Sequence, residues 1–311
     1  MAAKLYGLTF TALTDIPKYH EDVLAYEVKE ANGIHIGILF MDFFTRDSKR
    51  GGAWMTSYRR QSKKENLRVS PIISIVCNYA RPAAGESALL TPEEVETLFH
   101  EFGHALHGLL SNVSYESLSG TSVPRDFVEL PSQIMEHWAF EPEVVQAYAV
   151  HEHTGEVIPE ELIEKMKNAS KLNQGFATVE YLAASFLDMG YHTLGSGESV
   201  NVPDFEKEQM ENLGLIRQIS PRYRSTYFQH VFSGGYSAGY YSYIWSEVLD
   251  SDAYAAFKEA GSIFDPAVAT SFRQNILEKG GTADPMDLYK SFRGREPEVR
   301  FLLKNRGLET I

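Results

Sequence analysis

The segment 91–110 constrains the fold most strongly, because it carries the signals of a long amphipathic helix. Thr91 suits the N-cap, Pro92 suits the first helical position, and Glu94 can complete a capping box with Thr91. Apolar residues recur at helical spacing and can face a core: Val95, Leu98, Phe99, Phe102, Leu106 and Leu109. Turn-forming residues at 111–112 end the pattern, and no proline interrupts it before that point.

The middle of this predicted helix carries the string His100-Glu101-Phe102-Gly103-His104. Positions i and i+4 share one helical face, so the two imidazoles can converge on one metal ion. Glu101 is offset by one residue and can reach a water on that ion, where it would act as general base. Such a string arises by chance in roughly one chain in a hundred of this length. The helical context is what makes it indicate a zinc-peptidase site.

A catalytic zinc ion usually has three protein ligands and one open position. The metzincin arrangement would need Gly at position 107 and His at position 110. The chain has His107 and Leu110 there, which excludes that class. His107 lies one turn further along the same face, too far from His100 for both to bind one ion. It is expected to pack in the core or to orient a ligand.

The third ligand is therefore expected on a separate helix, within the segment 126–133. Glu129, which lies 29 residues after His100, is the candidate. Asp126 could cap that helix with Glu129 at its N3 position. A capping carboxylate is the alternative interpretation of Glu129.

In combination, these motifs resemble the M3 family of zinc peptidases. The matching segments are 98–104, 120–129, 131–133, 220–225 and 234–245. The segments 46–49, 77–79, 82–86 and 166–170 resemble the bacterial peptidyl-dipeptidase branch of that family. The resemblance extends over nearly the whole chain. It implies a zincin-like (gluzincin) catalytic domain that is mostly α with a small β-sheet (α+β).

By position, the resemblance implies one zinc ion held by His100, His104 and Glu129, with Glu101 as general base. Members of the family are typically much longer than this chain. The chain is therefore expected to be their C-terminal catalytic half. The missing N-terminal half would be needed for a complete substrate channel.

The tyrosine-rich segment of the family implies catalytic roles for His230, Tyr236 and Tyr243, and a substrate contact for Tyr240. The spacing of the tyrosines at i, i+4 and i+7 independently predicts three phenols on one helical face. Such a stripe is ordinarily core packing. Beside a zinc motif, phenols that donate to a developing oxyanion become the better interpretation. Tyr241 and Tyr236 compete with Tyr240 for that role.

The expected function is zinc-dependent hydrolysis of peptide bonds in short peptides. The resemblance favours the release of C-terminal dipeptides. The alternatives are an oligopeptidase that cuts internal bonds and an inactive zinc-binding fragment. A dipeptide-releasing enzyme needs a cation for the free C-terminal carboxylate of its substrate. Arg125 is the first candidate, Arg222 and Arg224 are alternatives, and all three could instead form structural ion pairs.

Composition limits the other function classes. A net charge of −13 disfavours nucleic acid and anionic membranes as partners. No apolar run is long enough to span a membrane, and the first residues lack a secretory pattern. The single Cys77 cannot form an internal disulfide, which fits a reducing compartment such as the cytoplasm.

The chain is expected to form one catalytic unit in three regions. Residues 1–90 should hold a β-hairpin over 23–44 and a strand over 72–78, of which 75–79 is expected at a sheet edge, where substrate could pair with it. Residues 91–140 should hold the zinc-binding helices, and 141–311 a helical region with the tyrosine-rich segment. The helices expected in that last region are 143–153, 159–188, 204–213, 221–231, 237–260, 265–278 and 285–293.

Overall fold

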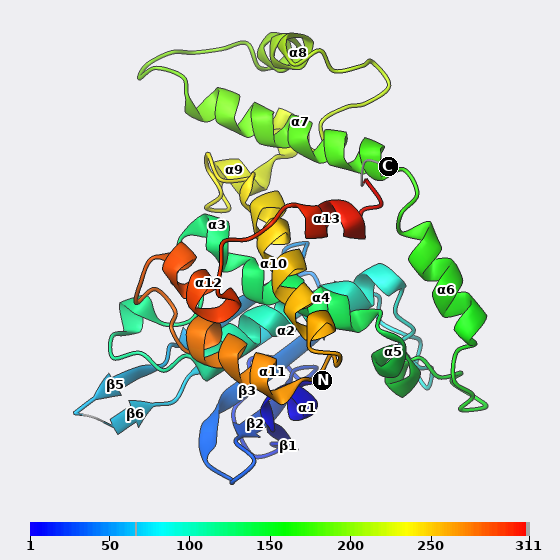
Figure 1. The fold of residues 1–311 in the computed structure, drawn as a ribbon, viewed down its shortest axis with the longest axis vertical. Coiled ribbons are helices and arrows are strands. Elements are labelled where there is room, and N and C mark those ends of the chain that lie inside the picture. Colours follow the sequence, from blue (N-terminus) through cyan, green and yellow to red (C-terminus); the bar gives the residue numbers. More distant parts are fainter. Residues whose placement is uncertain (66, 309–311) are drawn as a thin grey trace.

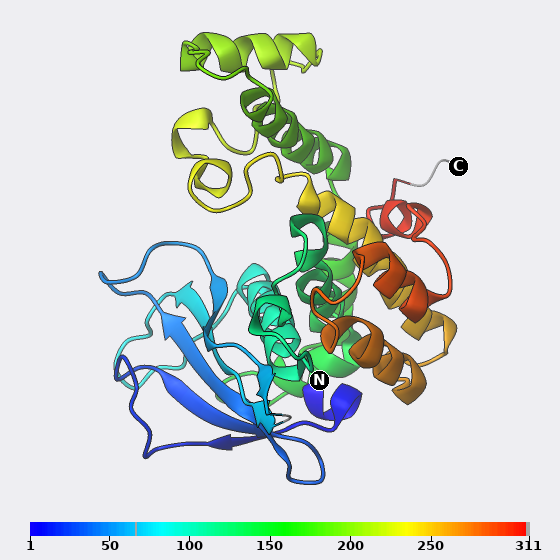
Figure 2. The same ribbon diagram turned by 90° about the vertical axis from the view of Figure 1, so that its left-hand side faces the viewer.

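The computed structural model describes residues 1–65 and 67–308. A five-stranded sheet packs against α2 (Pro92–Leu110), and α4 (Leu130–Ala139) packs against α2. Figure 2 shows the sheet on one side of these two helices and the C-terminal helices on the other. The predicted class, mostly α with a small sheet, is confirmed.

The sheet has the strand order β1-β2-β3-β7-β4. Its strands are β1 (Thr9–Ala12), β2 (Leu24–Lys29), β3 (His35–Phe44), β4 (Trp54–Arg59) and β7 (Ile72–Tyr79). A turn at 30–34 joins the antiparallel strands β2 and β3, and Gly33 adopts a φ of 85° there. β3 pairs with β7 in parallel. Two short strands, β5 (Ser62–Lys64) and β6 (Leu67–Val69), form a separate hairpin.

The prediction that 75–79 lies at a sheet edge is wrong. β7 is an interior strand, because β3 pairs with one side of it and β4 with the other. β4 reaches only as far as Val76 of β7, and the loop 46–52 covers the remainder. The Asn78 amide donates to the carbonyl oxygens of Arg50 and Gly52, at 2.9 and 2.7 Å. A continuous apolar run such as 71–77 is typical of a strand buried on both faces, which agrees with this position.

The capping box predicted for α2 is present. The Glu94 backbone N–H donates to Thr91 Oγ1, and the Thr91 backbone N–H donates to the Glu94 carboxylate. The helix presents Leu106 and Leu109, both fully buried, to the main core. This core also holds Ile73 and Ile75 of β7. Local capping and non-local burial therefore stabilise the same helix.

The region after Phe140 is helical but more interrupted than expected. Its helices are α5 (Pro142–Tyr148), α6 (Glu160–Ala169), α7 (Gln174–His192), α8 (Val202–Asn212), α9 (Gln229–Phe232), α10 (Ser242–Glu259), α11 (Pro266–Phe272), α12 (Pro285–Arg293) and α13 (Arg300–Asn305). The single helix predicted over 159–188 is two helices, because Asn173 adopts a left-handed φ of 58° between them. Most of the predicted helix 221–231 is loop, with α9 at its end.

Figure 1 shows α7 and α8 at the end of the molecule away from the sheet. α10 runs from the region of α7 down alongside α4. Among the described residues, no helix is both long and apolar enough to cross a membrane.

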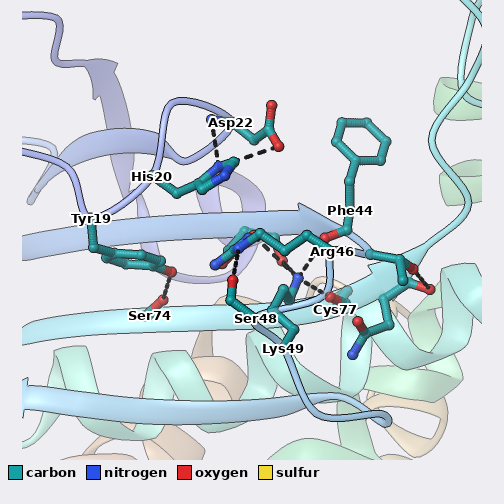
Figure 3. Close-up of polar contacts among 12 residues, drawn as sticks. Tyr19, His20, Asp22, Phe44, Arg46, Ser48, Lys49, Ser74 and Cys77 are labelled. Atoms are coloured by element: carbon teal, nitrogen blue, oxygen red, sulfur yellow. Dashed lines mark hydrogen bonds and ion pairs between the residues drawn. The ribbon is translucent and has the colours of Figure 1, made fainter.

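A buried ammonium group ties the ends of β3 and β7 together. Lys49 lies within hydrogen-bond reach of the carbonyl oxygens of Phe44 (2.8 Å) and Cys77 and of the Asp42 carboxylate (3.2 Å), as Figure 3 illustrates. Arg46 donates two further bonds to the same carboxylate, at 2.7 and 2.8 Å. The Asp42 and Lys49 side chains are only 1% and 3% exposed. These bonds fix the loop 46–52 to the ends of β3 and β7.

Candidate metal centre and active site

The structure brings His100, His104 and Glu129 together. The Nε2 atoms of His100 and His104 lie 3.2 and 3.1 Å from the same carboxylate oxygen of Glu129. The three potential ligand atoms all lie within 4.8 Å of one another. Both histidines come from one face of α2, as their spacing predicts, and Glu129 reaches them from the facing chain segment.

Glu129 lies between two helices rather than inside one. It follows α3 (Arg125–Val128) and immediately precedes α4. The prediction that Asp126 caps a helix with Glu129 at N3 is therefore wrong, because Asp126 lies inside α3 and its side chain accepts a hydrogen bond from Tyr241. The Glu129 carboxylate accepts bonds from Ser132 Oγ (2.9 Å) and from the Tyr236 hydroxyl. The carboxylate is thus held in place from two sides.

Gly103 allows this close approach of the two helices. A Cβ atom at position 103 would lie only 2.1 Å from the carbonyl oxygen of Pro131 and 2.6 Å from Cα of Ser132. Only glycine fits between the metal-facing part of α2 and the start of α4.

Glu101 is buried beside the two histidines. The residue is 4% exposed, and its Oε2 atom has no hydrogen-bond partner among the described residues. Burial raises the pKa of its carboxyl above the ordinary value. A buried carboxylate oxygen without a partner is costly unless a ligand or water completes it.

Glu136 is a functional candidate that the sequence patterns did not single out. Its Oε1 atom lies 2.5 Å from His100 Nδ1, the ring nitrogen that faces away from Glu129. A carboxylate in this position fixes the tautomer and orientation of a metal-binding imidazole. The signal that could have revealed it is spacing, because Glu136 follows Glu129 by seven residues, about two helical turns.

The charged groups of this cluster interact with one another. Burial opposes ionisation of His100, but hydrogen bonds to Glu129 and Glu136 raise its pKa well above the ordinary value. Burial likewise opposes ionisation of Glu129, yet the nearby imidazoles hold its pKa well below the usual range.

His107 belongs to the core. It is fully buried, neither of its ring nitrogens has a hydrogen-bond partner in the described part of the chain, and burial lowers its pKa to about 3. It is not among the residues whose ligand atoms converge. The expectation that it packs rather than binds the metal agrees with this position.

The tyrosines meet, but not on a helical face. Tyr236 and Tyr240 precede α10, which starts only at Ser242, so the predicted helix over 237–260 is wrong at its start. Ala238 has a left-handed φ of 52°, which interrupts any helix there. The Asp188 carboxylate of α7 accepts the backbone N–H groups of Ala238 and Tyr240, both at 2.9 Å. A carboxylate from a distant helix thus shapes the segment 234–241, which we call the tyrosine loop.

Within this arrangement, the Tyr236 and Tyr243 rings stack 5.2 Å apart. Burial raises the pKa of both phenols, so both hydroxyls remain protonated donors. The His230 ring centroid lies 6.3 and 6.4 Å from those of these two rings, and its Nδ1 atom is buried without a partner among the described residues. Tyr240 is 2% exposed, and its ring packs at 4.8 Å from Phe228. His230, Tyr236 and Tyr243 are only half-buried, so they are more accessible than Tyr240.

Arg125 packs against the tyrosine loop. Its guanidinium group lies 4.5 Å from the centroid of the Tyr236 ring, and its side chain lies close to Gly235 and Gly239. Arg224 forms an ion pair with Glu206. Arg222 lines a cleft of about 320 Å³ beside His230 and Tyr243.

Two imidazole nitrogens and one carboxylate oxygen are the protein donor set of a catalytic zinc site that keeps a further position for water or substrate. The shared approach of both Nε2 atoms to Glu129 and the orphaned Glu101 oxygen fit such an ion.

The chain is similar in sequence to known peptidases. A sequence profile described as peptidase family M3 matches residues 1–308. Dipeptidyl carboxypeptidase of Escherichia coli (strain K12) is 47% identical over 310 residues, covering 99% of this chain and 45% of the relative. Oligopeptidase A of the same strain is 39% identical over 315 residues, covering 98% and 45%. A solved structure titled BsuCP Crystal Structure has a TM-score of 0.48 and 15% identity over 76% of this chain and 50% of its own.

The chain thus spans less than half the length of these curated relatives. The resemblance inferred from its motifs is confirmed by the profile match over nearly every residue. The chain belongs to peptidase family M3.

Proposed function

We propose that this chain hydrolyses peptide bonds of short peptides at a single zinc site and releases C-terminal dipeptides. The observation that carries the proposal is the convergence of His100, His104 and Glu129 beside the unpaired carboxylate of Glu101. Membership of a peptidase family and the 47% identity to a dipeptidyl carboxypeptidase support it. A gluzincin-type arrangement and a single catalytic unit for the three predicted regions are part of the same proposal.

A zinc ion held by these three residues would lower the pKa of a bound water to about 7 and polarise the carbonyl of the scissile bond. Glu101 Oε2 accepts the proton of the attacking water, since no donor among the described residues occupies that atom. Glu101 then passes this proton to the leaving amine. Glu136 keeps the His100 ring oriented through Nδ1.

Charge that develops on the substrate oxygen needs a hydrogen-bond donor. Tyr243 is the better candidate, because the Tyr236 hydroxyl already donates to Glu129. Tyr236 would then steady the ligand and stack on the donor ring. His230 supplies a further unpaired nitrogen beside both phenols. A preorganised donor of this kind contributes about 3–4 kcal/mol to barrier lowering.

A second candidate function is cleavage of internal bonds in short peptides. The 39% identity to oligopeptidase A supports it. A reducing compartment such as the cytoplasm is also a proposal, which the buried free thiol of Cys77 supports.

The test compares the wild-type chain with Glu101→Gln and with the control Glu93→Gln, an exposed glutamate at the start of the same helix. We expect all three to bind one zinc ion by metal analysis after dialysis. Glu101→Gln should lose on the order of 100-fold or more in turnover, as expected for a general base, while Glu93→Gln keeps it.

Mass spectrometry of the products separates the two peptidase functions. A peptide with a blocked N-terminus should release its C-terminal dipeptide, whereas internal cleavage would produce longer fragments. A wild-type chain that binds zinc and cleaves neither kind of peptide would contradict the proposal and support a zinc-binding fragment without activity.

A further inference from the structure

We propose that Arg222 binds the free C-terminal carboxylate of the substrate and thereby selects peptides that end two residues beyond the cut. This inference rests on the proposed function and names the residue that sets its specificity.

Arg222 lies in the wall of a cleft that adjoins the metal centre. The cleft has a volume of about 320 Å³, and its lining includes Gln133, Tyr181, Arg222, His230, Tyr243 and Glu247. Gln133 follows Glu129 by four residues, so it lies one turn along α4 from the metal ligand. Tyr243 stacks on the ring whose hydroxyl bonds Glu129. Through these two residues, the cleft adjoins the segments that carry the metal centre.

The cations near this cleft differ in their partners. Arg306 also lines it, but its Nε and Nη2 atoms donate to the Glu247 carboxylate and its Nη1 atom donates to Thr178 Oγ1. Arg224, two residues after Arg222, pairs with Glu206. Among residues 1–65 and 67–308, no carboxylate forms an ion pair with Arg222. Its guanidinium group is the cleft's available anion-binding group, and a carboxylate can accept two parallel hydrogen bonds from it.

The position of Arg222 is fixed by the backbone. Its N–H group donates to the carbonyl oxygen of Glu180 in α7, at 3.2 Å. The adjacent Tyr223 ring lies 5.1 Å from the His230 ring, which places Arg222 near the aromatic wall. The charge of Arg222 also helps burial to lower the pKa of His230, so the two groups lie within electrostatic reach. An anchored cation loses less freedom on binding than one on a mobile loop.

Two further polar atoms line the cleft with Arg222. Gln133 Oε1 and His230 Nδ1 are buried and have no hydrogen-bond partner among the described residues. A peptide backbone offers the N–H and C=O groups that would satisfy them. The lining of the cleft thus suits a peptide end in its chemistry: one cation for the carboxylate and two polar atoms for the backbone.

Arg125, the first candidate from the sequence, is engaged elsewhere. Its guanidinium group lies against the Tyr236 ring, and it does not line this cleft. From this position, Arg125 packs against the tyrosine loop and supports it.

The experiment measures binding of acetyl-tetraalanine and of its C-terminal amide to the zinc-loaded chain by calorimetry. The Glu101→Gln background is used so that the peptide is not consumed. With Arg222 present, the free acid should bind about 10- to 100-fold more tightly than the amide, the range of a charge-assisted hydrogen-bonded pair. Arg222→Gln should reduce this ratio to about one, and Arg222→Lys should retain part of it.

Arg224→Gln removes the same charge from the same segment and is the matched control. It should leave the preference for the free acid unchanged, because Glu206 already neutralises Arg224. A preference that survives Arg222→Gln, a loss shared equally by Arg224→Gln, or no measurable binding of the free acid would overturn the proposal. Circular dichroism of each variant shows whether the substitution at Arg222 or Arg224 has unfolded the chain.

Peptide cleavage by the Arg222 and Arg224 variants, made in the chain that keeps Glu101, separates this inference from the proposed function. An Arg222→Gln chain that still hydrolyses peptides, but acids and amides alike, supports Arg222 as the specificity residue. If Arg222 controls acid binding and no variant hydrolyses any peptide, the proposed function fails while the carboxylate site stands.

Discussion

Replacing Gly103 by alanine should damage both the fold and the metal centre. Helix propensity alone predicts the opposite, because Gly→Ala inside a helix usually gains about 1 kcal/mol. Position 103 lies between His100 and His104, the proposed zinc ligands, and faces the start of α4. The added Cβ atom would lie 2.1 Å from the Pro131 carbonyl oxygen, whereas real Cβ contacts essentially never fall below 3.0 Å.

The magnitude follows from this overlap. The difference between 3.0 and 2.1 Å requires α2 and α4 to separate by about 0.9 Å. Overpacking of this kind costs about 1–3 kcal/mol, so subtracting the propensity gain of about 1 kcal/mol leaves a net loss of up to about 2 kcal/mol. Metal–ligand distances tolerate only about 0.2 Å. Because Glu129 moves with α4, we expect zinc affinity to fall on the order of 100-fold.

Two measurements check this expectation. Urea unfolding of the metal-free chain gives the change in stability, and competition with a chromophoric chelator gives the zinc affinity. Gly175→Ala is the control, because nothing lies within 4 Å of a Cβ atom there. This variant in α7 should gain about 0.5–1 kcal/mol. If Gly103→Ala gains stability as the control does, or keeps its zinc affinity, the close-approach argument is refuted.

Two further predictions concern buried charges. Lys49→Met should destabilise the chain by about 3–5 kcal/mol in urea unfolding, because it leaves the Asp42 carboxylate and nearby carbonyl oxygens without their ammonium donor. The control Lys165→Met removes an exposed ion pair with Glu161 and should change stability by less than about 0.5 kcal/mol. If the two variants lose the same amount of stability, the argument from burial is contradicted. Asp250 is buried at 2.7 Å from His137, and burial together with nearby glutamates raises its pKa well above the ordinary value. A raised pKa stabilises the fold below the unfolded-state pKa and loses that contribution as pH rises through the folded-state pKa. Asp250→Asn should therefore raise the melting temperature at pH 7, and this gain should shrink towards pH 4. A wild-type chain that melts at a higher temperature than Asp250→Asn at pH 7 would show the reasoning to be wrong.

The zinc helix was predictable because its signals are local. Thr91 and Glu94 cap it within one turn, and the spacing of its apolar residues marks the buried face. The i, i+4 spacing of His100 and His104 needs only helical geometry to place both imidazoles together. For Glu129, local sequence did not distinguish a helix-capping carboxylate from a metal ligand, because the neighbouring residues do not indicate which helix Glu129 faces.

The tyrosines show where local pattern fails. Their i, i+4, i+7 spacing predicted a helix, yet Asp188 captures the backbone N–H groups of Ala238 and Tyr240 from another helix. A buried carboxylate that accepts two N–H bonds outweighs the modest helical propensity of a few residues. The sheet gives a similar case, since whether β7 lies at an edge depends on the partner strand β4 and not on β7 itself.

The order of residues alone was enough to reveal the motif of His100 and His104, the capped helix that carries it, and the mostly α class with a small sheet. Only the folded chain decided that Glu129 meets the two imidazoles, that Glu136 contacts one of them, and that Arg222 rather than Arg125 lines the cleft, with no ion-pair partner among the described residues. The physical reason is range. Helix periodicity and capping act within a few residues, whereas metal ligation, ion pairing and close helix approach join groups that are far apart in the chain.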